Sequence, residues 1–223
     1  MSCDSLGRGA RLRRWGWLVP GVIGLFLAVA ADAHADDGGD GNVVAIEEDW
    51  ELVVKEPDEE TQGPQVTCII APNNDDAGLL AAFNLNHKSF PQYDAGGLHL
   101  QLWQGDTPLE SAQFPSDALL TTANETVTWT TRMRLHEGRL WFEIVSGSSS
   151  TWGDFGATGT LMASVATELP HLNDYEASDS TSNSGVGFAG NRVTSLKLKS
   201  VRKMLKSGDV VEDTETRTIY PQD

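Results

Sequence analysis

Hydrophobic and polar residues alternate most regularly in the stretch from Glu125 to Val145. One largely apolar face of its first half consists of Val127, Trp129, Thr131, Met133 and Leu135. The second half repeats the same period with Leu140, Phe142 and Ile144. A period of two is typical of a β-strand with one buried face, and Gly138 between the halves can adopt the positive φ that a tight turn requires. The pattern therefore predicts an antiparallel β-hairpin.

Further short apolar runs predict more strands, separated by clusters of turn-forming residues. They cover residues 43–54, 65–70, 79–85, 98–103, 186–188 and 193–201. No long segment keeps a helical period. The two segments that come nearest to one, residues 115–122 and 161–169, are short. Residues 173–184 are rich in Asp, Ser and Asn and are too polar for a core. Many short strands with turn chemistry between them predict an all-β fold, a two-sheet antiparallel sandwich of jelly-roll type rather than a closed barrel.

The first 35 residues are typical of an export leader. Four arginines precede an uncharged apolar run that ends at Ala31, and Ala33-His34-Ala35 provides the small-x-small pattern that a leader peptidase accepts. The alternative is an uncleaved membrane anchor, which needs about 20 apolar residues. Only 17 uncharged residues run from Trp15 to Ala31. We therefore expect cleavage before Asp36 and a periplasmic, cell-surface or extracellular protein.

This leader implies a simple domain organisation. We expect a signal peptide over residues 1–35, an acidic flexible tether over 36–42, one β-sandwich domain over 43–205, and an edge strand or C-terminal tail over 206–223.

The whole chain has a net charge of −16, and removal of the leader leaves 12 basic and 30 acidic residues. Nucleic-acid binding depends on Lys and Arg at phosphates, so this composition excludes nucleic acid as a partner. It equally disfavours an anionic membrane surface, and no membrane span is expected after cleavage.

Cys68 is the only cysteine that follows the predicted cleavage site. An exported domain with one cysteine has no internal disulfide, so core packing must hold it together. Cys68 lies in the apolar run 66–71, which predicts a buried, unreactive thiol.

The second half of the chain resembles the concanavalin A-like jelly rolls, the superfamily of legume lectins, laminin G modules and many glucanases. The resemblance covers residues 125–202 and rests on the stretches VTWTTRMRLHEGRLWFEIVSG, SSTWGDFG and SGVGFAGNRVTSLKLKSVR. In that family a late G-x-G-F strand precedes a last core strand, and Gly185-Val186-Gly187-Phe188 matches it. The resemblance implies a sandwich with a curved face and calcium-dependent or carbohydrate-binding behaviour.

Enzymes of that superfamily carry paired carboxylates on a central strand, and Glu47, Asp49 and Glu51 have the corresponding E-x-D-x-E spacing. On a strand all three lie on one face, with neighbours about 6.6 Å apart, a separation that glycoside hydrolysis can use. The competing interpretation is a solvated edge strand whose charges block aggregation. Because Glu47 lies 12 residues after the cleavage site, where a first strand is usually at an edge, we favour the edge strand and expect no catalytic role.

Two loops offer oxygen ligands for calcium, the one cofactor for which the sequence provides candidates. These ligands are Asp75 and Asp76 in the first loop and Asp174 and Asp179 in the second. Neither loop has the Asp-x-Asn-x-Asp-Gly spacing of a specific calcium loop. The competing interpretation is an ordinary turn, held by hydrogen bonds between side chains and backbone.

Two tryptophans are candidates for a ligand-binding surface. Trp141 has the opposite parity to its apolar neighbours, and Trp152 lies in a loop rich in Gly and Ser. These two rings are the better candidates on the condition that they are exposed, because large exposed aromatic side chains commonly mark contact surfaces. Trp129 shares the parity of Met133 and is expected in the core.

Together these features predict an exported, non-catalytic β-sandwich module that binds a carbohydrate or a protein partner. One alternative is a glycoside hydrolase of the same fold that uses Glu47, Asp49 and Glu51. Another is a structural component of the envelope without a small ligand. The place of the carboxylates in the sheet discriminates between the first two, because a central strand favours the hydrolase and an outer edge excludes it.

We predict that the exported protein begins at Asp36, because the peptidase cuts after the small residue Ala35. Its intact mass, measured on protein from the periplasm or the culture medium, should be that of residues 36–223. A mass that includes the apolar run would identify an uncleaved anchor instead.

Overall fold

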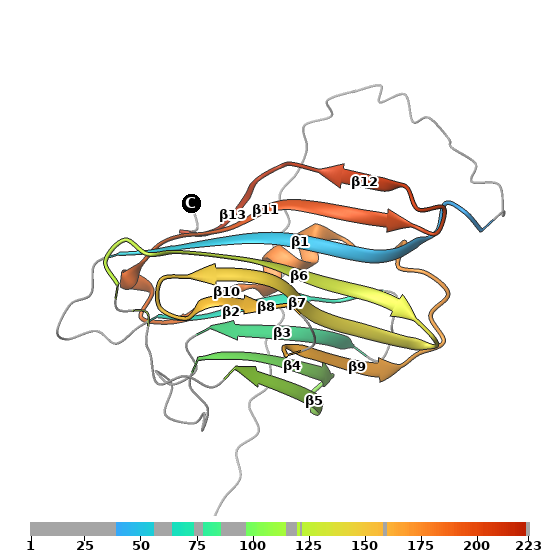
Figure 1. The fold of residues 1–223 in the computed structure, drawn as a ribbon, viewed down its shortest axis with the longest axis horizontal. Helices are drawn as coiled ribbons and strands as arrows, with labels where there is room; N and C mark the ends of the chain where they lie inside the picture. The colour runs from blue at the N-terminus through green and yellow to red at the C-terminus, as the bar shows by residue number, and fades with distance from the viewer. Residues whose placement is uncertain are drawn as a thin grey trace, which may run out of the picture. The chain divides into compact units, whose positions relative to one another are not determined.

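The computed structural model of this chain describes residues 39–55, 64–73, 78–85, 97–114, 120, 122–157 and 160–221. These residues form thirteen β-strands in two antiparallel sheets, with one α-helix and one 3₁₀ helix at Gly190–Arg192 (Figure 1). The predicted all-β, two-sheet antiparallel architecture is confirmed. No helix within these ranges is long and apolar enough to cross a membrane.

The larger sheet has eight strands, and six of them follow the order β12-β11-β1-β6-β7-β8. Beside this path, β13 pairs with β11 and β9 pairs with β7. The strands are β1 (Val43–Val54), β6 (Thr126–His136), β7 (Arg139–Ser149), β8 (Gly153–Gly156), β9 (Met162–Ala166), β11 (Val193–Leu205), β12 (Val210–Asp213) and β13 (Arg217–Tyr220). The predicted hairpin forms β6 and β7, and both turn residues, Glu137 and Gly138, have a positive φ.

The smaller sheet has five strands in the order β10-β2-β3-β4-β5. They are β2 (Gln65–Ile70), β3 (Leu79–Leu85), β4 (Leu98–Gln104), β5 (Thr107–Phe114) and β10 (Gly185–Phe188). Helix α1 (Ala177–Asn183) precedes β10. It lies within residues 173–184, which are expected to be too polar for the core. That expectation is wrong for Tyr175, Ser180 and Ser184, which are buried. Polar side chains are tolerated inside a protein when their polar atoms are hydrogen-bonded, as the Tyr175 hydroxyl is.

β1 lies inside the larger sheet, with β11 on one side and β6 on the other (Figure 1). Asp49 is paired with Ser200 of β11 and with Thr130 of β6. The prediction that this first strand lies at an edge is therefore wrong. Strand order in a sheet follows chain order only in part, and here the late strand β11 pairs with the side of β1 that would otherwise be free.

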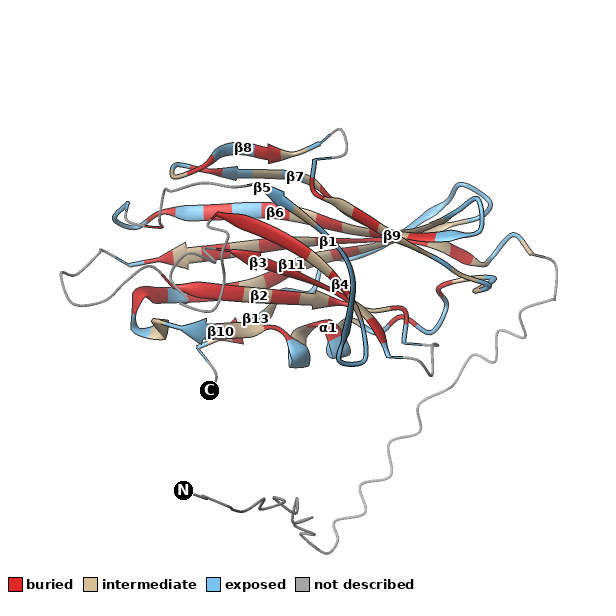
Figure 2. Cartoon of the chain, turned by 90° about the horizontal axis from the view of Figure 1, so that it is seen from below, coloured by how far each residue is buried: buried red, intermediate tan, exposed pale blue. Residues whose placement is uncertain are grey.

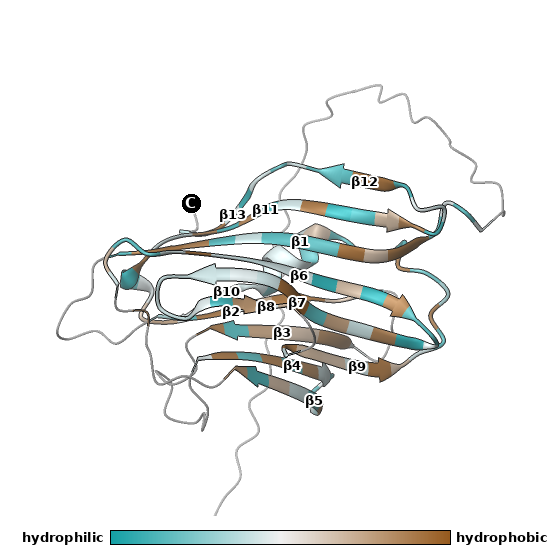
Figure 3. Ribbon diagram, in the orientation of Figure 1, coloured by the Kyte–Doolittle hydropathy of each residue, from teal (hydrophilic) through white to brown (hydrophobic). Residues whose placement is uncertain are grey.

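Aromatic rings from both sheets meet in the core between them. Trp50 and Trp129 stack in parallel with ring centroids 6.1 Å apart, and Phe83 of the smaller sheet lies 5.8 Å from Trp129. Hydrophobic and hydrophilic residues alternate along β1, β6 and β11 (Figure 3), and buried residues run along β2, β3 and β4 (Figure 2). Cys68 of β2 is buried, and this burial raises the pKa of its thiol, as expected for an unreactive cysteine.

Gly147 makes room for an aromatic ring near the edge of the larger sheet. It pairs with Phe155 of β8, and a Cβ at residue 147 would overlap the Phe155 ring. The ring continues inward to Phe83, with centroids 6.4 Å apart. The short strand β8 is thereby anchored to the core, and with it the exposed residue Asp154.

Glu48 is a carboxyl group on the inner face of β1 and is only 1% exposed. Trp50 Nε1 donates a hydrogen bond to its Oε2 at 3.0 Å, and the Tyr175 hydroxyl donates to its Oε1 at 2.6 Å. Burial raises the pKa of Glu48, and the interactions with Ser180, Tyr175 and Trp50 offset only part of that effect. Glu48 therefore links β1 to the segment before α1, and its burial disfavours the charged form of the carboxyl group.

Gly147→Ala should lower the free energy of unfolding by about 1–3 kcal/mol, the usual cost of overpacking a core, because the new Cβ overlaps the Phe155 ring. Denaturant unfolding followed by tryptophan fluorescence measures this change. Gly187→Ala is the matched control, since a Cβ at that strand position meets no atom within 4 Å. Equal stability of the two variants would contradict the described packing.

Glu48→Gln should stabilise the domain near neutral pH and change its stability little near pH 4. Because the pKa of Glu48 is raised on folding, the contribution of this group to stability is fully present below the unfolded value of about 4.5 and is lost as pH rises through the folded value. A glutamine keeps an acceptor for Trp50 and presents a donor to the Tyr175 oxygen. Melting temperatures from about pH 4 to pH 8 test this, with the exposed Glu168→Gln as control. A difference that does not grow with pH would refute it.

Candidate functional site

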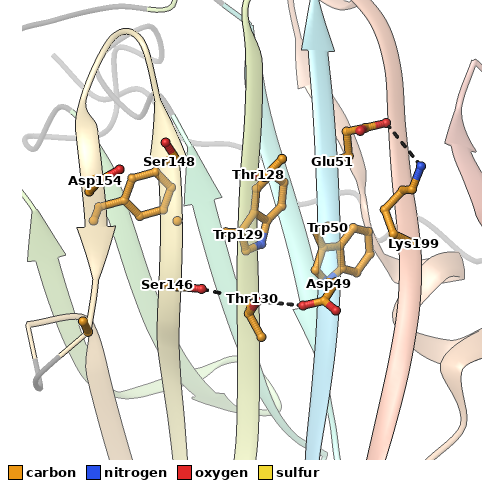
Figure 4. A pocket seen from close by; sticks show the side chains of 13 residues that line it. Asp49, Trp50, Glu51, Thr128, Trp129, Thr130, Ser146, Ser148, Asp154 and Lys199 are labelled. Carbon is orange, nitrogen blue, oxygen red and sulfur yellow. Dashed lines mark hydrogen bonds and ion pairs between the residues drawn. The ribbon is translucent and has the colours of Figure 1, made fainter. Parts of the chain in front are cut away.

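A groove of about 540 Å³ crosses the outer face of the larger sheet (Figure 4). It runs over five neighbouring strands, from Lys199 on β11 to Asp154 on β8. The other polar side chains that line it are Asp49, Glu51, Thr128, Thr130, Ser146 and Ser148. These side chains project from the strands on the face opposite to the core.

Strand register arranges the polar side chains in two rows across the sheet. The first row runs through Glu51, Thr128, Ser148 and Asp154. The second row consists of Asp49, Thr130 and Ser146. In the second row Thr130 Oγ1 donates to Asp49 Oδ1 at 2.7 Å, and Ser146 Oγ lies 3.5 Å from Thr130 Oγ1 (Figure 4). Carboxylates therefore stand at the margins of the groove and hydroxyl groups between them.

A β-bulge in β7 turns its serines toward the groove. The register shifts between the pairs Thr131–Ile144 and Thr130–Ser146, so Val145 is an extra residue. An extra residue reverses the faces of the positions that follow it. Without the bulge, Ser146 would point into the core.

A second register shift, in β11, introduces Lys199 at the other margin. Asp49 pairs with Ser200 and Trp50 with Leu198, which leaves Lys199 between them as the extra residue. Its Nζ lies 3.7 Å from Glu51 Oε1 (Figure 4). Glu51 thus has an ammonium partner at the β11 side of the groove.

Two arginines hold Glu47 beside the groove. Arg132 of β6 donates through Nε to Oε1 at 2.7 Å, and Arg202 of β11 donates through Nε to Oε2 at 3.0 Å. Both carboxylate oxygens are occupied, and the Glu47 side chain is only 9% exposed. The structure therefore places this candidate catalytic residue in an ion-pair cluster rather than in the groove.

Asp49 shares the Arg202 guanidinium with Glu47 and also accepts a hydrogen bond from Ser200 Oγ at 2.8 Å. Partial burial disfavours its charge, but the hydrogen bonds from Arg202 and from two hydroxyl groups outweigh this effect and lower the pKa of Asp49. Asp49 is therefore ionised at neutral pH. It can accept hydrogen bonds from a ligand but is a poor proton donor.

Trp152 does not offer an exposed ring. It is 8% exposed and belongs to the core, so the condition for its candidacy as a ligand-binding residue, an exposed ring, is not met. The buried Glu125 carboxylate accepts hydrogen bonds from the Thr151 backbone N–H at 2.9 Å and from its hydroxyl at 2.5 Å. These bonds fold the turn before β8 back against β6, which brings Trp152 inside.

Trp141 is half-buried on the outer face of β7, outside the groove. The guanidinium carbons of Arg134 and Arg139 lie 5.5 Å and 5.8 Å from its ring centroid. Cation–π contacts of this kind stabilise an aromatic side chain at the surface. A role of Trp141 in ligand binding stays a prediction.

The candidate calcium ligands do not form a metal group in the described parts of the chain. Asp75 and Asp76 lie outside the described residues. Asp174 and Asp179 are both exposed, and the Asp179 carbonyl accepts a hydrogen bond from Asn183 within α1. Across the described ranges, no three His, Cys, Asp or Glu side chains gather as metal ligands would.

The sequence does not predict Asp154 as a site residue, and it does not predict that the hydroxyl groups of the groove lie close together. The sequence does indicate that Thr126, Thr128 and Thr130 share the outer face of their strand, because they alternate with core residues. Their convergence with Ser146 and Ser148 depends on the β7 bulge, and the place of Asp154 depends on pairing of the short strand β8. Neither is encoded in the local alternation.

No protein-family model matches this chain, and no curated protein matches it. Function must therefore be inferred from the groove, its charges and its surroundings.

Proposed function

We propose that this protein is an exported, non-catalytic β-sandwich module that binds an oligosaccharide in the groove of Figure 4. The observation that carries the proposal is the pair of polar rows, one across four strands and one across three, with hydroxyl groups between the carboxylates of β1 and Asp154 of β8. Carboxylates accept hydrogen bonds, and hydroxyl groups both donate and accept them. Sugar hydroxyls need such partners at close and regular spacing.

The composition of the groove favours a carbohydrate over a protein partner. Protein interfaces are centred on aromatic and aliphatic anchors. Among the described residues, the exposed large hydrophobic side chains are Leu109, Phe188, Val210 and Val211, and none of them lines the groove. The aromatic residues that do line it are Trp50, Trp129 and Phe155, which are buried in the core and offer no exposed anchor. Five strands spaced about 4.8 Å apart span roughly 19 Å, which suits an elongated chain of sugar rings.

The central position of β1 favours a second candidate function, a glycoside hydrolase. Asp49 and Glu51 both line the groove from successive outward positions, about 6.6 Å apart along the strand. Hydrolysis, however, requires a carboxylic acid that keeps its proton through a raised pKa. The pKa of Asp49 is lowered, and Glu51 is engaged with the Lys199 ammonium. Binding is therefore the better supported of the two functions.

We predict that Thr128→Val and Ser148→Ala each weaken oligosaccharide binding about fivefold, the effect of losing one hydrogen bond of about 1 kcal/mol. A glycan array, with and without calcium, identifies the ligand for the exported protein, and calorimetry then measures the affinity of each variant. Thr194→Val is the matched control, since this exposed threonine of β11 lies outside the groove.

Three outcomes separate the functions. Unchanged affinity in both groove variants would place the ligand elsewhere. Absence of any glycan binding would refute the proposal and favour the structural envelope role. Release of reducing sugar by the wild type, lost in Glu51→Gln, would support the hydrolase.

A further inference from the structure

We propose that the groove prefers oligosaccharides that carry free amino groups, such as β-1,4-linked glucosamine, over neutral or acidic ones. This inference rests on the proposed function and names the class of sugar bound. It is carried by the uneven distribution of charge between the two margins of the groove.

The β11 margin of the groove is balanced in charge. Glu51 faces the Lys199 ammonium at 3.7 Å, and Arg202 forms an ion pair with Asp49. A ligand at this margin meets ionised groups whose charges are already compensated. Neutral sugar hydroxyls fit this environment.

The β8 margin is not balanced. Asp154 is exposed there and forms no ion pair with any basic side chain in the described part of the chain. An ammonium group on the ligand would supply the missing countercharge. The geometry therefore points to a cationic substituent at this end of the groove.

Asp154 belongs to a row of hydroxyl groups and does not stand alone. Ser148 and Thr128 continue the row toward Glu51, over three strand spacings or about 14 Å. A sugar chain along this row can hydrogen-bond with both hydroxyl groups while one amino group reaches Asp154. The Phe155 ring packed over Gly147 keeps β8 in place for this contact.

Charge elsewhere in the chain works against acidic glycans. The net charge of −16 creates a repulsive field for uronic or sulfated chains. Three arginines near the groove on the same face have acidic partners: Arg132 and Arg202 pair with Glu47, and Arg134 pairs with Glu143. Arg139, also on this face, lies outside the groove and is hydrogen-bonded to Ser164.

Two tetrasaccharides that differ only in N-acetylation, and therefore in charge, test the preference: the β-1,4-linked glucosamine tetramer and its fully N-acetylated form. At low salt and mildly acidic pH, we expect the free-amine tetramer to bind the exported protein about fivefold more tightly, the strength of one exposed ion pair. Added salt should reduce this ratio. Asp154→Asn should bring the ratio close to one. Asp174→Asn, which removes an exposed carboxylate outside the groove, should preserve it.

Equal affinity of the two tetramers for the wild type, or a ratio that survives Asp154→Asn, would overturn the amino-sugar preference and leave the oligosaccharide function standing. If the protein binds another neutral glycan but neither tetramer, the amino-sugar preference is likewise overturned and the oligosaccharide function stands. Absence of binding to every glycan would overturn both. Asp154-dependent binding of tetralysine as tight as that of the free-amine tetramer would also overturn the sugar assignment, in favour of a basic peptide.

Discussion

β1 must satisfy two environments at once, because the side chains of a strand alternate between two faces. Toward the core it supplies Trp50 and Leu52, and toward solvent it supplies Asp49 and Glu51. Pairing with β11 and β6 along its length sets this register. A slip of one residue would exchange the two sets, so both the core and the groove depend on this double pairing.

The charged residues of the outer face are organised around the same strand. Arg132 and Arg202 approach β1 from opposite sides and meet at Glu47, and Arg202 also reaches Asp49. Partly exposed ion pairs contribute little to stability. Their main consequence is positional, since they fix the Glu47 and Asp49 carboxylates of β1. Asp154 on the far margin is left as the uncompensated acidic group within the described groove.

Several elements could be predicted from local patterns, and the exceptions have physical causes. Residues 43–54 and 65–70 form β1 and β2 as predicted, because their apolar residues are buried in the core. β5 is mostly exposed and therefore lacks apolar alternation. Residues 161–169 have the nearest approach to a helical period, yet they contain β9, because pairing with β7 outweighs weak local preference.

Local alternation is sufficient to specify an all-β chain, its hairpin and the common face of Glu47, Asp49 and Glu51. It is not sufficient to place that face in a sheet. Asp49 meets Thr130 across 81 positions and Ser200 across 151, and no local pattern encodes such pairings. The bulges in β7 and β11 then choose which side chains enter the groove. The site therefore arises from long-range pairing, because register between distant strands is set by the packing of the whole core.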